Sequence, residues 1–131
     1  MTKLSREELV NEFKQLTSPK AVDFNLSHTD YIDFMEVGGS AYIDRCITHG
    51  ESAIQKSIST LCETNSDILA NASCVFFYFH ISAHYSVVDI QKHIDIAYEV
   101  IHDECAMAFA TSFDDTVEEN FVEIVMIITG A

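Results

Sequence analysis

Near the middle of the chain lies one uninterrupted apolar run, and few folds can accommodate it. The run reads Cys74-Val75-Phe76-Phe77-Tyr78-Phe79. Side chains of a β-strand alternate between its two faces, so a strand over this run is apolar on both. Such a strand is stable in the interior of a sheet that is covered on each side. The sequence therefore predicts a buried central strand, and these residues are the best core candidates.

Two segments have the apolar spacing of helices that could cover this sheet. The first extends from about Glu51 to Glu63, with its apolar side chains on one side. The second begins at Ser86, which forms a capping box with Asp89, and continues to about Asp103. Each helix must bury its apolar stripe, so both are expected to pack on the sheet.

Three further segments have strand character: Ser40–Thr48, Cys105–Phe113 and Phe121–Thr129. The acidic segment from Asp114 to Glu119 is expected to join the last two as a hairpin-like connection.

The N-terminal part is predicted to be helical and then irregular. Ser5 and Glu8 form a capping box, and the helix should end at about Leu16, before a proline-containing segment. Lys20–Thr29 is loop-like, and Asp30 to about Val37 has the pattern of a short helix.

This order of elements predicts an α+β fold, a two-layer sandwich with a four-stranded mixed sheet and two main helices. The length of 131 residues fits one domain. We divide the chain into residues 1–37, with the first helix, the loop and the short helix, and an α+β domain at 38–131.

The charge restricts the classes of partner. The chain has 21 acidic and 7 basic residues, a formal net charge of −14. It would repel nucleic acid and anionic membrane surfaces. The apolar runs are far shorter than the ~20 residues that span a bilayer, and the N-terminus is polar. We therefore expect no membrane span, no signal peptide and a cytoplasmic location.

No metal or cofactor is expected from the cysteines and histidines. The cysteines have wide, irregular spacings without a CxxC pair, which favours reduced thiols. His80 and His84 have a spacing that brings two imidazoles together only in a helix, whereas here it begins in a strand and crosses into a turn. The cysteines are Cys46, Cys62, Cys74 and Cys105.

Several segments, in order, resemble FtsZ, the bacterial tubulin-like division GTPase. Residues 110–115, Ala-Thr-Ser-Phe-Asp-Asp, and the final strand ending Ile-Thr-Gly-Ala resemble its closing strand pair. Residues 72–75 and 80–83 resemble an earlier strand of that family. Ser18-Pro19 and Asp30–Met35 resemble the end of its central helix and the catalytic loop beyond. The similarity extends from about Phe13 onward and implies the tubulin/FtsZ C-terminal domain, although Ala110 and His84 replace glycines.

The resemblance does not extend to the GTPase half of the family. Its glycine-rich phosphate loop would precede the first helix, where this chain has only a few residues. Gly38-Gly39 follows the expected short helix instead of opening one, so it cannot present a row of amides to a phosphate. The sequence also ends at the last strand, without the family's linker and tail.

In FtsZ the loop after the central helix carries an asparagine and two acids that complete the GTPase site of the neighbouring subunit. With Met35 as anchor, Asn25 and Asp30 match the asparagine and the second acid, and the first acid is lost. With Val22-Asp23-Phe24 as anchor, Asp23 supplies the first acid and Ala21 replaces the asparagine. Asp30 matches the second acid in both registers, given a short insertion. The alternative is that Asp30 only caps the helix that follows it.

Three functions follow as expectations. The leading one is a stand-alone module, not itself an enzyme, that docks on an FtsZ/tubulin-like GTPase or its filament in cell division. The second is the C-terminal piece of a split or truncated FtsZ-like GTPase. The third is a small oligomeric α+β ligand-binding or enzyme subunit. A weak homo-oligomer is a further alternative.

The chain should neither bind nor hydrolyse GTP, because no segment offers the amide cradle and cation that a triphosphate needs. Calorimetry of the chain with GTP and magnesium should give no measurable heat of binding. Micromolar affinity would contradict this interpretation.

Overall fold

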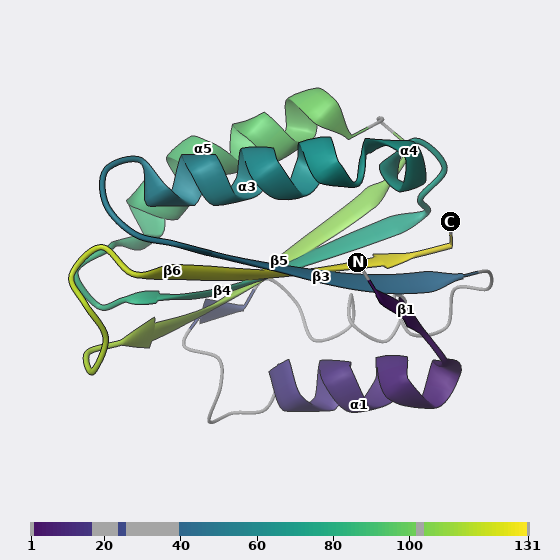
Figure 1. Ribbon diagram of the computed structural model, residues 1–131, viewed down its shortest axis with the longest axis horizontal. Helices are drawn as coiled ribbons and strands as arrows, with labels where there is room; N and C mark the ends of the chain where they lie inside the picture. The colour runs from purple at the N-terminus through teal and green to yellow at the C-terminus, as the bar shows by residue number, and fades with distance from the viewer. Residues whose placement is uncertain (1, 17–23, 26–39, 102–103, 131) are drawn as a thin grey trace.

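The computed structural model describes residues 2–16, 24–25, 40–101 and 104–130 (Figure 1). Their strands form one mixed sheet in the order β1-β3-β6-β4-β5-β2. The strands are β1 (Thr2–Leu4), β2 (Phe24–Asn25), β3 (Ala41–Thr48), β4 (Cys74–Ser82), β5 (Ala106–Asp114) and β6 (Val122–Thr129). The helices are α1 (Arg6–Leu16), α3 (Ala53–Thr64), α4 (Ser66–Leu69) and α5 (Val87–Val100).

The apolar run forms the interior strand β4, as predicted. It pairs in parallel with β5 over its whole length and antiparallel with β6 on the other side. Val75, Phe77 and Phe79 point to one face of the sheet and are fully buried. Phe76 and Tyr78 point to the other face and are also buried. Both faces of the sheet are therefore covered at β4.

The two faces have separate cores. The first core lies under α3 and α5, which Figure 1 shows side by side above the sheet. It includes Phe77 and Phe79 with Ile58 and Leu61 of α3. The second core lies on the opposite face and includes Leu9 of α1 together with Phe76 of β4. The two main helices and the sheet form the predicted two layers, and α1 is added beneath them (Figure 1).

Side-chain caps fix the starts of two helices. The Ser86 hydroxyl accepts a hydrogen bond from the Asp89 amide, and the Asp89 carboxylate accepts one from the Ser86 amide. Ser5 and Glu8 make the same reciprocal pair before α1. These hydrogen bonds confirm both predicted capping boxes. Each box supplies acceptors to amides that the first turn of a helix leaves without a partner.

The predicted hairpin of the last two strands is wrong. β5 and β6 do not pair with each other, because β4 lies between them and binds both. The acidic connection therefore crosses the end of β4. The reason is the two-sided apolar character of β4, which excludes it from an edge position.

The sheet also has more strands than the four predicted, because two short strands extend its edges. β1 pairs with the start of β3. β2 pairs with β5 and lies inside Lys20–Thr29, which was expected to be loop. The expected helix at Asp30–Val37 lies outside the described residues.

Beyond β1, a side chain occupies one backbone donor of β3. β1 covers only Ala41–Ile43 of β3. Just beyond it, the Arg45 amide donates a hydrogen bond of 2.9 Å to the Asp44 carboxylate. Asn65 donates to the other oxygen of that carboxylate, also at 2.9 Å. The Asp44 side chain is thus held against the backbone of β3.

Among the described residues, no helix is both long and apolar enough to cross a bilayer.

Phe77→Ala should lower the free energy of unfolding by about 3–5 kcal/mol, because it removes a fully buried ring and leaves a cavity. The Phe77 ring stacks on Phe109 with centroids 5.6 Å apart. Urea denaturation followed by circular dichroism measures the change. Val88→Ala, at a position 57% exposed on α5, is the matched control and should stay within about 0.5 kcal/mol of the wild type. Equal effects at the two positions would contradict this account of the core.

Candidate functional site

The structure places one of the three candidate residues taken from the FtsZ-type loop. Asn25 lies in β2, where its backbone pairs with Ala110 of β5. Asp23 and Asp30 lie outside the described residues, as does the expected division between residues 37 and 38. Their roles remain predictions.

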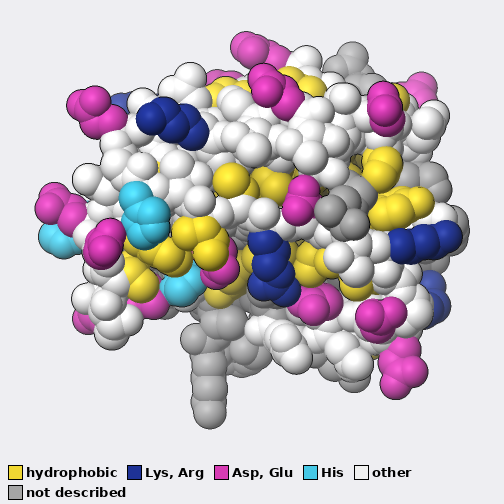
Figure 2. Space-filling model, in the orientation of Figure 1, with side chains coloured by type: hydrophobic (Ala, Val, Ile, Leu, Met, Phe, Trp, Pro, Cys, Tyr) yellow, Lys and Arg dark blue, Asp and Glu magenta, His cyan; other side chains and the backbone are white. Residues whose placement is uncertain are grey.

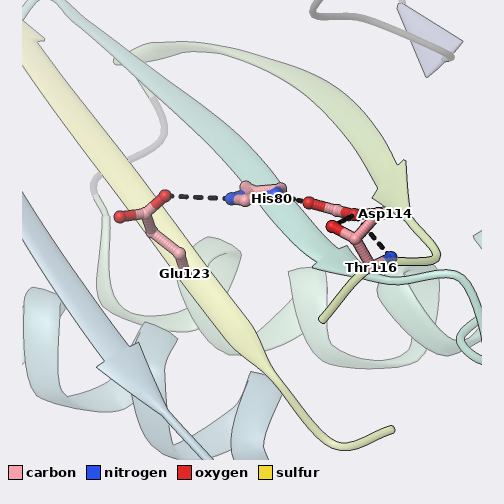
Figure 3. A network of polar contacts seen from close by, with 4 residues as sticks. All are labelled: His80, Asp114, Thr116 and Glu123. Carbon is pink, nitrogen blue, oxygen red and sulfur yellow. Dashed lines mark hydrogen bonds and ion pairs between the residues drawn. The ribbon is translucent and has the colours of Figure 1, made fainter. Parts of the chain in front are cut away.

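A second group of polar side chains comes together where three strands meet (Figure 3). His80 lies near the end of β4, Asp114 at the end of β5 and Glu123 near the start of β6. His80 is directly opposite Glu123 in the strand register. The alternation of each strand puts all three side chains on the sheet face that α1 covers elsewhere.

Both nitrogens of the His80 ring contact a carboxylate. Nε2 lies 2.7 Å from Asp114 Oδ2, and Nδ1 lies 3.1 Å from Glu123 Oε1 (Figure 3). An ionised carboxylate only accepts hydrogen bonds, so each nitrogen must donate. This arrangement fits the imidazolium, which carries both protons.

Opposing influences act on the pKa of His80. Burial of the ring is the largest single influence and lowers the pKa. The hydrogen bonds to Asp114 and Glu123, with the attraction of both negative charges, act in the other direction. Together they outweigh burial, so the pKa lies above the ordinary value for histidine. The three side chains are each about one-quarter exposed, so solvent screens the pairs only in part.

Asp114 is also held from the loop that follows it. Its Oδ1 accepts hydrogen bonds from the Thr116 hydroxyl at 2.5 Å and the Thr116 amide at 2.8 Å (Figure 3). The hydroxyl bond, followed by the bond from His80 and that from the Thr116 amide, lowers the pKa of Asp114 to about 2. Asp114 is therefore ionised at all ordinary pH values.

Aromatic and apolar groups border this cluster. The Phe121 ring lies edge-on to His80, with centroids 5.4 Å apart, and edge-on to His49 at 5.6 Å. His49 in turn is 3.1 Å from Glu118. Ile47, opposite Glu123 on β3, is 57% exposed. Figure 2 shows histidine, acidic and apolar side chains gathered at one end of the visible face.

The chemistry available to the cluster is proton binding and hydrogen bonding. Both ring nitrogens of His80 are occupied by carboxylates. No group of three metal-ligating side chains with suitable geometry occurs within the part of the chain that the structure describes. Burial raises the pKa of the Cys62 and Cys105 thiols to about 11, so they remain protonated and are poor nucleophiles.

Sequence reasoning missed this cluster, although it singled out His80. His84 lies exposed in the turn after β4, so the H-x3-H pair does not act as a unit. The available signal was a histidine in an otherwise apolar strand, which needs polar partners from neighbouring strands. The erroneous hairpin hid them, because it placed β5 beside β6 instead of on the other side of β4.

Solved structures give a clear comparison for the fold. FtsZ of M. jannaschii, as the W319Y mutant, superimposes with a TM-score of 0.72 over 95% of this chain. The fold is that of the FtsZ C-terminal domain. Sequence identity is 19%, and the match covers 39% of the FtsZ chain.

Two further FtsZ-type structures agree. An empty FtsZ dimer of M. jannaschii matches with a TM-score of 0.72, 16% identity and coverage of 89% of this chain and 34% of that one. GDP-bound monomeric CetZ1 of Haloferax volcanii matches with 0.54, 10% identity, and coverage of 98% and 41%. This chain thus spans about two-fifths of the length of these proteins or less. No family model and no curated protein matches the sequence.

Asp114→Asn should reduce the decrease in the free energy of unfolding that occurs as the pH falls. The folded-state pKa of about 2 lies below the ordinary value of 3.8, so ionised Asp114 stabilises the fold above about pH 4 and this contribution is lost as the pH falls towards 2. Denaturation in urea at pH 6, 4 and 2.5 should show a smaller decline in the variant. Asp115→Asn, at the exposed next position, is the control and should retain the wild-type decline. An unchanged decline in Asp114→Asn would contradict the assignment.

Proposed function

We propose that this chain is an interaction module that docks on an FtsZ/tubulin-type GTPase or on its filament, in cell division or a related cytoskeletal process. The observation that carries the proposal is the fold, matched over nearly the whole chain by FtsZ. One of those matches is an FtsZ dimer, so a protein containing this fold associates with a second copy. By analogy, we propose that the present chain docks on an FtsZ-type subunit.

The charge and surface of the chain are compatible with such a role. The net charge of −14 disfavours polyanions and favours a partner with a basic surface. Exposed Ile47 beside the His80 cluster provides apolar area next to polar groups, as interfaces commonly do. In this proposal the module has no activity of its own.

A second candidate is the C-terminal piece of a split or truncated FtsZ-like GTPase. It is supported by the coverage of 34–41% of the FtsZ-type chains, since the matched region is only a part of those proteins. The two candidates differ in their partner: a complete FtsZ-type protein for the first, and a separate GTPase half for the second.

Sedimentation with a polymerising FtsZ-type GTPase from the same cells separates these candidates. A docking module should pellet with filaments in GTP and stay in the supernatant in GDP. A split half should instead form a stable complex with a GTPase half at either nucleotide. Absence of binding to both would contradict the proposal.

Asp30→Ala tests whether the module also completes the partner's GTPase site. If it does, the variant should fold and bind as the wild type while the partner's turnover falls, since the acid acts mainly in the transition state. If Asp30 only caps a helix, the variant should lose about 0.5–2 kcal/mol of stability and leave turnover unchanged. Melting temperature and GTPase rate, measured at saturating module, distinguish the two.

Asp23→Ala and Asn25→Ala in the same assay decide the register of the loop. Loss of turnover with Asp23→Ala supports the Val22-Asp23-Phe24 alignment. Loss with Asn25→Ala alone supports the alignment anchored on Met35. A wild-type chain that never stimulates a GTPase would rule out the catalytic role and leave docking to be judged by sedimentation.

A further inference from the structure

His80 connects the end of β5 to the start of β6 across β4, and neither proposed function gives its proton a role. When the ring is charged, it donates one hydrogen bond to Asp114 and one to Glu123. β5 and β6 have no direct pairing, so this bridge ties two strands that the backbone ladder joins only through β4. The bridge requires two protons on one ring.

The two carboxylates are not equally anchored. Asp114 also accepts two hydrogen bonds from Thr116, which fix it whatever the state of His80. Among the described residues, the Glu123 carboxylate makes a hydrogen bond only with His80. The residue opposite Glu123 on β3 is the exposed, apolar Ile47. The contact with Glu123 is also the longer of the two, 3.1 Å against 2.7 Å.

These differences determine which contact a neutral ring keeps. Neutral histidine has one N–H and one bare nitrogen. The proton is best retained on Nε2, where Asp114 is fixed in place and close. The bare Nδ1 then faces the Glu123 carboxylate, and two acceptors repel each other.

We propose that His80 is a proton-controlled latch: charged, it holds the start of β6 to the end of β5, and on losing its proton it keeps Asp114 and releases Glu123.

The latch acts on the acidic connection between β5 and β6, residues 115–121. Phe121 at its end contacts the His80 ring, and the Phe121 carbonyl accepts a hydrogen bond from the Ser82 amide. At its beginning the Asp114 carbonyl accepts one from the Ala83 amide. Release of Glu123 therefore removes a side-chain restraint next to the Phe121 end, which keeps its backbone hydrogen bond to Ser82, while the Asp114 side chain stays held by Thr116.

Among the described residues, other charged groups near the latch pair with one another and not with the His80 ring. On the connection, Glu118 pairs with His49, whose ring lies 5.6 Å from that of Phe121. On β3, Arg45 pairs with Glu12 of α1 at 3.4 Å. The charges that act on the His80 pKa are those of Glu123 and Asp114.

The direction of the pH effect follows from the raised pKa of His80. Between the ordinary histidine pKa of 6.5 and the higher folded-state value, the folded chain holds a proton that the unfolded chain has lost. Stability from this group is therefore complete below about pH 6.5 and declines as the pH rises through the folded-state pKa. In that interval the unfolding equilibrium constant rises by up to about tenfold per pH unit.

Nuclear magnetic resonance of the full chain tests the latch from pH 5 to 9. The His80 ring nitrogens should titrate above 6.5, with Nδ1 losing the proton. The Glu123 side-chain carboxyl carbon should shift with the same midpoint, and protection of the amides at 121–123 from hydrogen exchange should fall. A Glu123 signal that does not follow His80, or proton loss from Nε2, would overturn the proposal.

Glu123→Gln gives an independent test, because an amide can accept from the charged ring and donate to the neutral one. This variant should keep the fold and make protection at residues 121–123 independent of His80 protonation. His84→Gln removes the exposed histidine of the next turn and should leave the wild-type dependence intact. The proposal would be overturned if amide protection at residues 121–123 still followed His80 protonation in Glu123→Gln. It would also be overturned if protection no longer did so in His84→Gln.

Discussion

The two-sided burial of β4 organises this fold. Phe77 and Phe79 on one face and Phe76 on the other are fully buried, so both faces of this strand need a cover. Each face requires its own cover, which α3 and α5 supply on one side and α1 in part on the other. Each edge also requires a strand, since buried backbone groups must be paired. β5 and β6 fill those edges, and β3 then extends the sheet beyond β6.

The same arrangement explains why a charged histidine can sit at the end of an apolar strand. Alternation places His80 on the face of Phe76 and Tyr78, and the strands on either side each bring a carboxylate to it. An unpaired charge would be costly at a position only about one-quarter exposed. Two hydrogen bonds to carboxylates offset the cost of removing the charged ring from water. The polar cluster is therefore a product of strand order as much as of local sequence.

Much of the fold could be predicted from local sequence. The residues of β4, the capping boxes of Ser5 and Ser86, and the amphipathic stripe of α5 each carry a periodicity or a cap that depends on near neighbours alone. Strand pairing depends on competition between distant segments, and there the prediction failed: β5 and β6 were joined although β4 binds both. The short strands β1 and β2 are too brief to have a periodicity. The His80 cluster was missed for the same reason as the pairing, because its members are 34 and 43 residues apart from His80 in the chain.

The contact of Asp44 with its own strand has a consequence for solubility. An exposed strand edge offers free backbone donors and acceptors to any other extended chain, and proteins that remain soluble disrupt such edges with charged side chains. The Asp44 carboxylate accepts from the Arg45 amide where β1 no longer covers β3, and Asn65 keeps it there. That donor is withdrawn from an incoming strand, and a negative charge stands in its place. At this position, pairing of β3 with the strand of another chain would first have to displace the Asp44 carboxylate.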